Sequence, residues 1–133
     1  MRKHRLLEMP LFFALIGAAW AGAFTRALGA EIEIRRGIVF AEVSEQKLAL
    51  DLHLPGGDAI RPLIVWVHGG AWRAGSRAEM PLGALVRDGF AVASVDYRLS
   101  PVARFPAQVH DIKAAIRFLR SRAAEFRLDP KIG

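Results

Sequence analysis

The sequence contains no cysteine among its 133 residues. Disulfide bonds, iron–sulfur clusters and a cysteine nucleophile are therefore excluded, and the chain needs no oxidising compartment. Its histidine and acidic residues do not follow the spacing of a metal site, and no glycine-rich phosphate loop is present. We therefore expect neither a metal nor a cofactor.

Long blocks of like charge are also missing, although the chain carries a net charge of +6. From Phe24 onward it holds 16 basic and 12 acidic residues, so the excess is +4 and scattered. The arginine-rich segment after Pro106 also contains Asp111 and Glu125. Such mixed charge is typical of a solvated helix face, and we expect no nucleic-acid partner.

Residues 1–30 differ from the rest of the chain. A basic start is followed by an uncharged run of 14 residues, Leu11 to Phe24. A membrane span needs about 20 residues, whereas a signal peptide has a shorter apolar core. We predict a signal peptide cleaved near residue 23 or 30, and therefore a periplasmic or secreted protein with its domain in residues 31–133. An uncleaved membrane anchor and a misassigned start codon are the alternatives.

Strands are predicted from two different apolar patterns. Residues 46–54 place four leucines on one face and Ala49, Asp51 and His53 on the other, as in a half-exposed antiparallel strand with His53 in solvent. A weaker strand-like pattern covers residues 31–43. Residues 63–67 and 90–95 are uninterrupted apolar runs, which are typical of parallel strands buried on both faces.

Two helices are predicted from periodic apolar positions. Residues 79–88 suit a helix that is stopped by Gly89. A longer helix opens at Pro106 and ends near residue 128. Its apolar stripe has spacings of three and four residues, with Asp111 outside it; the stripe consists of Val109, Ile112, Ile116, Leu119, Ala123 and Phe126. The order of elements predicts an α/β fold.

The segment that follows the strand at residues 63–67 carries the most specific signal. It reads His68-Gly69-Gly70-Ala71-Trp72. Two glycines at the carboxyl end of a buried strand permit positive φ angles, and ligands bind at that end of an α/β sheet. Backbone N–H groups in such a turn can hold an oxyanion.

This motif resembles the oxyanion loop of α/β-hydrolases, in the His-Gly-Gly-x-Trp form of esterases and lipases. That form occurs in hormone-sensitive-lipase-like carboxylesterases and in feruloyl and acetyl-xylan esterases. The resemblance implies an oxyanion hole at Gly69, Gly70 and Ala71, with Gly70 and Ala71 as the donors. It also implies that His68 shapes the loop, and that Trp72 either lines the substrate pocket or packs the loop against the core.

The similarity continues from about Leu48 to Gly133, through the segments 96–101, 105–107 and 128–130. It implies the N-terminal portion of an α/β-hydrolase fold: a mostly parallel sheet with antiparallel leading strands and helices on both faces. Asp96, Tyr97 and Arg98 are expected to stabilise the loop after their strand, and Asp111 is expected to pair with Arg98.

The nucleophile motif of that family, Gly-x-Ser-x-Gly, does not occur in the sequence. Ser76, Asp96 and His110 have the residue types of a triad but lack its context. We therefore expect no catalytic residue in this chain, and interpret it as a copy truncated before the nucleophile elbow, with two apolar strands at an open sheet edge.

The expected function of the parent is hydrolysis of small-molecule carboxylic esters through an acyl-enzyme. The alternatives are an arylformamidase or peptidase of the same fold, or a non-catalytic short form.

Overall fold

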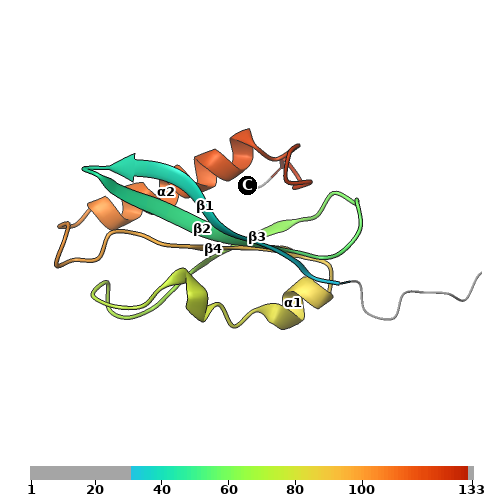
Figure 1. Cartoon of the computed structure of the whole chain (residues 1–133), viewed down its shortest axis with the longest axis horizontal. Coiled ribbons are helices and arrows are strands. Elements are labelled where there is room, and N and C mark those ends of the chain that lie inside the picture. The colour runs from blue at the N-terminus through green and yellow to red at the C-terminus, as the bar shows by residue number, and fades with distance from the viewer. Residues whose placement is uncertain (1–30, 132–133) are drawn as a thin grey trace, which may run out of the picture.

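The computed structural model describes residues 31–131. The predicted signal peptide in residues 1–30 lies outside the described residues. Four strands form one mixed sheet with helices on both faces (Figure 1). This arrangement confirms the predicted α/β class, and within the described residues the sheet contains one parallel pair and two antiparallel pairs.

The two leading strands form an antiparallel hairpin. Strands β1 (Glu33–Val43) and β2 (Gln46–Leu54) are joined through Ser44 and Glu45. Both of these residues have positive φ angles, 48° and 66°, as a two-residue hairpin of the primed type requires. The predicted bounds of β2 agree with the structure.

The two apolar runs form a parallel pair, β3 (Leu63–Val67) and β4 (Ala91–Val95), in the order β1-β2-β4-β3. Strand β4 therefore lies between two neighbours and all five of its residues are buried. Strand β3 has one neighbour among the described strands, and its five residues are only half-buried. The prediction that both strands are buried on both faces is thus correct for β4 and wrong for β3. Of these two strands, only β3 lies at an edge of the described sheet.

The apolar core lies between the sheet and helix α2 (Ala107–Ser121). Leucines of β2 and small residues of β4 meet Ala115 and Leu119 of the helix, and the chain beyond it adds Ala123 and Phe126. The residues after α2 then run beside the start of β3, where Asp129 N donates to Arg61 O at 2.8 Å. Both ends of the segment that follows the helix are therefore fixed against the sheet.

The opposite face of the sheet is covered by the 3₁₀ helix η1 (Arg77–Glu79) and by helix α1 (Gly83–Arg87). The prediction that β2 is half-exposed is wrong, because Asp51 on this face is 3% exposed. Its carboxylate accepts hydrogen bonds from Arg77 Nε at 2.9 Å and from Gly37 N at 2.8 Å. His53, on the same face, is half-buried on an interior strand and does not lie in solvent.

Both predicted helices differ from the structure in extent. The helix predicted at residues 79–88 is divided into η1 and α1 around Pro81, because proline has no N–H for the helix ladder. Helix α2 ends at Ser121, and its buried residues are Gln108, Asp111, Ala115 and Leu119. Asp111 therefore belongs to the buried face, because Arg98 neutralises it there, while Val109 and Ile112 are half-buried.

The burial of His53 predicts a pH dependence of stability. Burial lowers the pKa of His53, Asp51 opposes this change and Arg36 adds to it. The unfolded chain, with a histidine pKa near ~6.5, then binds a proton more readily than the folded chain. Stability contributed by neutral His53 is therefore present above about pH 6.5 and is lost as the pH falls toward the folded pKa.

We expect the urea midpoint of the full chain to fall between pH 7.5 and pH 5.5, and to fall less in His53→Gln. The same substitution at His110, an exposed residue of α2, serves as the matched control. A pH slope that His53→Gln leaves unchanged would contradict this assignment.

Candidate active site

The loop after β3 contains three consecutive residues in the left-handed region. Gly70 has φ +106°, Ala71 +52° and Trp72 +64°. The N–H groups of Arg73 and Ala74 both donate to Gly70 O, at 2.9 and 3.1 Å, and close the turn. Left-handed conformations cost roughly 1–2 kcal/mol for residues with a Cβ, so Ala71 and Trp72 are held there against their own preference.

This turn leaves backbone donors without partners. Gly70 and Ala71 are exposed, and their N–H groups donate to no described residue. Gly70 admits no side chain, since a Cβ there would lie 2.2 Å from Ala74 O. Adjacent, unpaired N–H groups in a fixed turn at the carboxyl end of a strand can stabilise a negative charge on a ligand.

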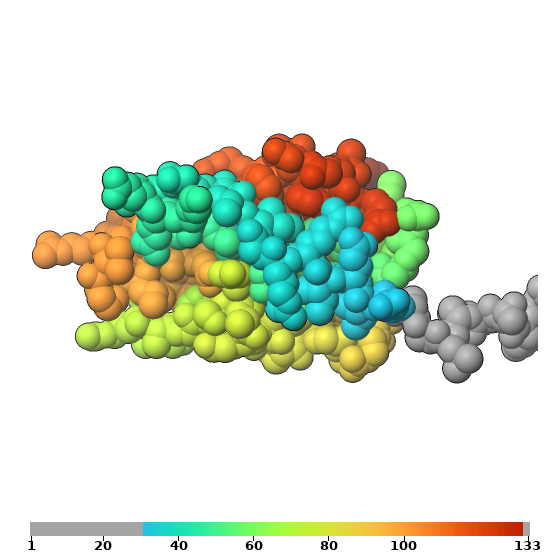
Figure 2. Space-filling view, in the orientation of Figure 1, coloured from blue at the N-terminus to red at the C-terminus, as the bar shows by residue number. Residues whose placement is uncertain are grey.

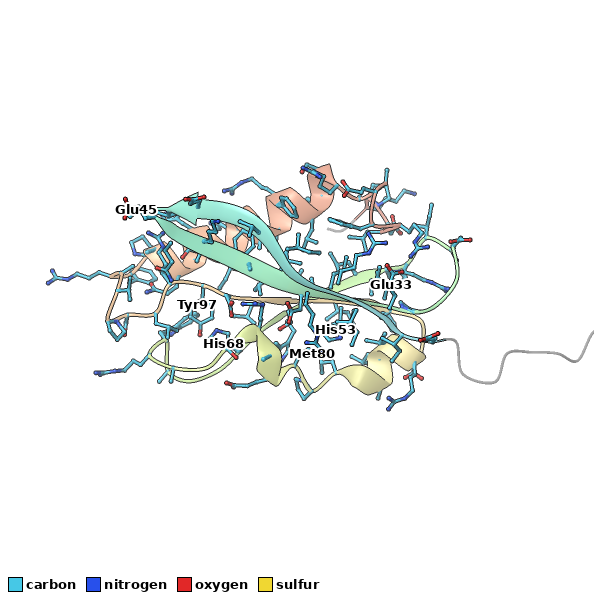
Figure 3. All side chains as sticks on the ribbon, viewed as in Figure 1. Glu33, Glu45, His53, His68, Met80 and Tyr97 are labelled. Carbon is cyan, nitrogen blue, oxygen red and sulfur yellow. The ribbon has the colours of Figure 1, made fainter. Side chains whose placement is uncertain are left out.

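His68 supports the loop from beneath and is 3% exposed. Its Nδ1 lies 2.8 Å from Gly69 O, and its ring stacks on Tyr97 with centroids 4.3 Å apart (Figure 3). The Tyr97 hydroxyl donates to His68 O at 3.1 Å. Burial, assisted by the charge of Glu79, raises the pKa of Tyr97, so the hydroxyl stays protonated and able to donate. These contacts suit a residue that shapes the loop.

Arg77 holds the segment that returns from the loop to the sheet. Its guanidinium lies between Asp51 of β2 and Asp96 at the end of β4 and pairs with both. Its backbone N–H donates to Asp96 Oδ1 at 2.8 Å, and its carbonyl accepts from Ser94 Oγ at 2.5 Å. The hydrogen bond to Asp51 and the contacts with Asp96 raise the pKa of Arg77.

A second loop, residues 96–106, packs against the first, and the two lie side by side at one end of the molecule (Figure 2). The N–H of Ser100 donates to Trp72 O at 2.8 Å. Asp111 anchors this second loop to α2, because its carboxylate accepts from Arg98 Nε at 2.8 Å, from Nη2 at 2.7 Å and from the backbone N–H at 3.0 Å. The predicted pair of Asp111 with Arg98 is confirmed.

The two loops and the start of α2 enclose a pocket of about 250 Å³. Ala71 and Trp72 of the first loop line it, and Phe105 and Val109 add apolar surface. Trp72 also contacts the edge of Tyr97, with ring centroids 5.3 Å apart, while half of its surface stays exposed. Trp72 therefore lines this pocket and also packs against Tyr97.

The three residues with triad chemistry do not form a triad. Asp96 is bonded to Arg77, Ser76 Oγ accepts from Ala78 N at 3.3 Å, and His110 is exposed on α2. Within residues 31–131, no group of three or more His, Cys, Asp or Glu side chains could hold a metal. The described part of the chain also has no helix that is long and apolar enough to cross a membrane.

Sequence reasoning missed Arg77 and the burial of Asp51. A single arginine in a glycine-containing loop carries no periodic signal, and the two carboxylates that it joins lie 26 residues before it and 19 residues after it. One signal for the pairing of Asp51 was available in the sequence, because a carboxylate in the middle of an otherwise apolar strand needs a partner when it is buried.

Comparisons with known proteins agree with this geometry. The family model described as BD-FAE matches residues 50–132. Isoprenylcysteine alpha-carbonyl methylesterase from Arabidopsis thaliana is 34% identical over 130 residues, which is 96% of this chain and 28% of that protein. Esterase LipC from Mycobacterium tuberculosis is 38% identical over 68 residues, 49% of this chain and 17% of that protein.

Among solved structures, a thermophilic esterase from Thermogutta terrifontis is similar with a TM-score of 0.61 and 30% identity. The match covers 79% of this chain and 38% of the esterase. The chain thus spans less than a third of the length of these curated relatives.

The close approach around Gly75 predicts a steric effect that can be separated from backbone strain. A Cβ at Gly75 would lie 2.4 Å from His68 Nδ1 and 2.6 Å from Gly69 O. Gly89 has a similar φ, +104° against +97°, but open space around it. We expect Gly75→Ala to lower the free energy of unfolding by about 1–3 kcal/mol more than Gly89→Ala, because it overpacks the loop. Urea denaturation of both variants measures the difference, and equal losses would show that His68 does not pack there.

The unpaired donors predict a pattern of hydrogen exchange. The amide protons of Gly70 and Ala71 are exposed and unbonded, so they should exchange at rates close to those of an unstructured peptide. The amides of Arg73 and Ala74 donate to Gly70 O and should exchange more slowly. Exchange of the full chain followed by nuclear magnetic resonance distinguishes the two pairs, and protected Gly70 and Ala71 amides would mean that these donors are already occupied.

Proposed function

The chain belongs to the BD-FAE family of α/β-hydrolase esterases, and from that premise we propose that it supplies the oxyanion-stabilising half of a carboxylic ester hydrolase. The observation that carries the proposal is the pair of unpaired N–H groups at Gly70 and Ala71, held in a left-handed turn after β3. Relatives named as esterases support the reaction class, and the resemblance of the loop motif supports the role of these donors.

In the proposed reaction a serine oxygen attacks the carbonyl carbon of the ester, and the carbonyl oxygen takes up the negative charge. The N–H groups of Gly70 and Ala71 donate to that oxygen, and because the turn is already formed they need no rearrangement when the charge develops. The alcohol then leaves, and water hydrolyses the acyl-enzyme. His68 is not the base in this scheme, because it is buried under the loop, only 3% exposed, and stacked on Tyr97.

We further propose that the serine, the acid and the histidine are encoded beyond the codon of Gly133. The lengths of the relatives support this part, since the chain covers 17% and 28% of the two curated esterases. Reading the gene past that codon tests it directly. An open frame with Gly-x-Ser-x-Gly, followed by Asp or Glu and then His, is the expected result. If a genuine stop codon follows instead, the hydrolase assignment would describe only the ancestry of the chain.

The role of Ala71 is tested in the full-length gene product by replacing the amide of this residue with an ester linkage. This change removes the N–H and retains the backbone angles. We expect kcat for p-nitrophenyl acetate to fall by about 10²–10³-fold, as for the loss of one oxyanion donor, with little change in KM.

Ala78 provides the matched control, because its N–H donates to Ser76 Oγ outside the loop. The same replacement there should leave kcat near the wild-type value. A loss at Ala71 no larger than at Ala78 would refute the donor role. Turnover of formanilide without turnover of the ester would instead assign the chemistry to a C–N bond.

A further inference from the structure

The pocket beside the oxyanion donors contains one cationic side chain with no partner. Arg73 lines the pocket, is exposed, and forms no ion pair with any described residue. Two neighbouring arginines that do not line the pocket differ in this respect. Arg77 is held by Asp51 and Asp96, and Arg98 is held by Asp111. Structural requirements therefore account for Arg77 and Arg98 but not for Arg73.

The remaining lining of the pocket is neutral. Trp72, Phe105 and Val109 present apolar surface. Gln108 is 3% exposed and uncharged, and one N–H of its Nε2 donates to Ala103 O at 2.7 Å. Arg73 is the charged residue among those that line the pocket, so a negative group there finds its counter-charge at Arg73.

The backbone of Arg73 is also fixed in position relative to the N–H groups of Gly70 and Ala71. Its backbone N–H closes the turn on Gly70 O at 2.9 Å, only two residues after Ala71. The guanidinium therefore projects from the same rigid turn that presents the oxyanion donors. A planar guanidinium with several donors is suited to bidentate recognition of a carboxylate.

From this arrangement we propose that the pocket selects esters that carry a second, ionised carboxylate a few atoms from the ester carbonyl, with Arg73 as the specificity-determining residue. The short apolar chain between the two groups lies against Trp72 and Phe105. This inference rests on the proposed function and goes beyond it, because it names the charge of the substrate.

Binding to the full 133-residue chain tests the proposal without turnover. Monomethyl glutarate carries its carboxylate on the acyl side, and acetoxyacetate carries it on the alcohol side. Their neutral counterparts are dimethyl glutarate and methyl acetoxyacetate. Each compound is titrated while the backbone amides of Gly70 and Ala71 and the indole N–H of Trp72 are followed by nuclear magnetic resonance.

We expect at least one carboxylate to bind about three- to tenfold more tightly than its neutral counterpart, as for one partly exposed ion pair. The preferred compound identifies the side of the ester that occupies the pocket. The preference should shrink at 0.5 M NaCl, because the pair is open to solvent.

Arg73→Gln should abolish the preference, and Arg104→Gln should retain it. Arg104 is a matched control, because it is also exposed and without an ion pair to a described residue, but it does not line the pocket. Equal binding of charged and neutral esters in the wild type, or a preference that survives Arg73→Gln, would overturn the proposal while leaving the ester-hydrolase assignment intact. If none of the four compounds shifts the Gly70 and Ala71 amides, the proposed function itself loses its support.

Discussion

The ion pairs of Arg77 with Asp51 and Asp96 are the interaction on which the rest of the structure depends. Asp51 lies in the middle of the sheet and is almost completely buried. A buried carboxylate without a partner is costly, and removing one member of such a network typically destabilises a protein by about 3–5 kcal/mol. The network therefore requires Arg77 to lie over the sheet, and this fixes η1 and the end of the loop that begins at His68. One arginine thus joins β2, β4 and the candidate active site.

The backbone of the loop that follows β3 is strained, and contacts with neighbouring residues stabilise it in this conformation. Gly70 O accepts two backbone N–H groups, Ser100 N donates to Trp72 O, and Tyr97 stacks on His68. These contacts hold Ala71 and Trp72 at positive φ before any ligand arrives. Preorganised donors stabilise a developing charge more effectively than donors that must reorient, so the strain has a function if the loop acts as proposed.

Local patterns in the sequence predicted the strands well and the charged contacts poorly. The run at 63–67, the alternation at 46–54 and the run at 90–95 each specify a strand, because burial of apolar side chains repeats along one segment. The same rule predicted that Asp51 faces solvent, because an alternating apolar pattern does not show that Arg77 covers that face of the sheet. Asp111 was misplaced for the same reason, although its pairing with Arg98 was predicted correctly. The oxyanion motif was recognisable because its glycines and its tryptophan are adjacent in sequence, whereas the unpaired state of Arg73 became visible only in the structure.

The position of β3 explains how the loop is preformed within the described residues. Strand β3 has β4 on one side only, and its residues are half-buried. The contacts that shape the loop after it all come from the β4 side: Tyr97 and Ser100 follow that strand, and Asp111 anchors their segment to α2. The geometry of the Gly70 and Ala71 donors is therefore held by contacts within residues 68–111 and by the ion pair of Arg77 with Asp51, all of which lie away from the unpaired edge of β3 in the described sheet. Under the proposed function, a nucleophile that approaches from that edge would meet backbone donors that are already in place.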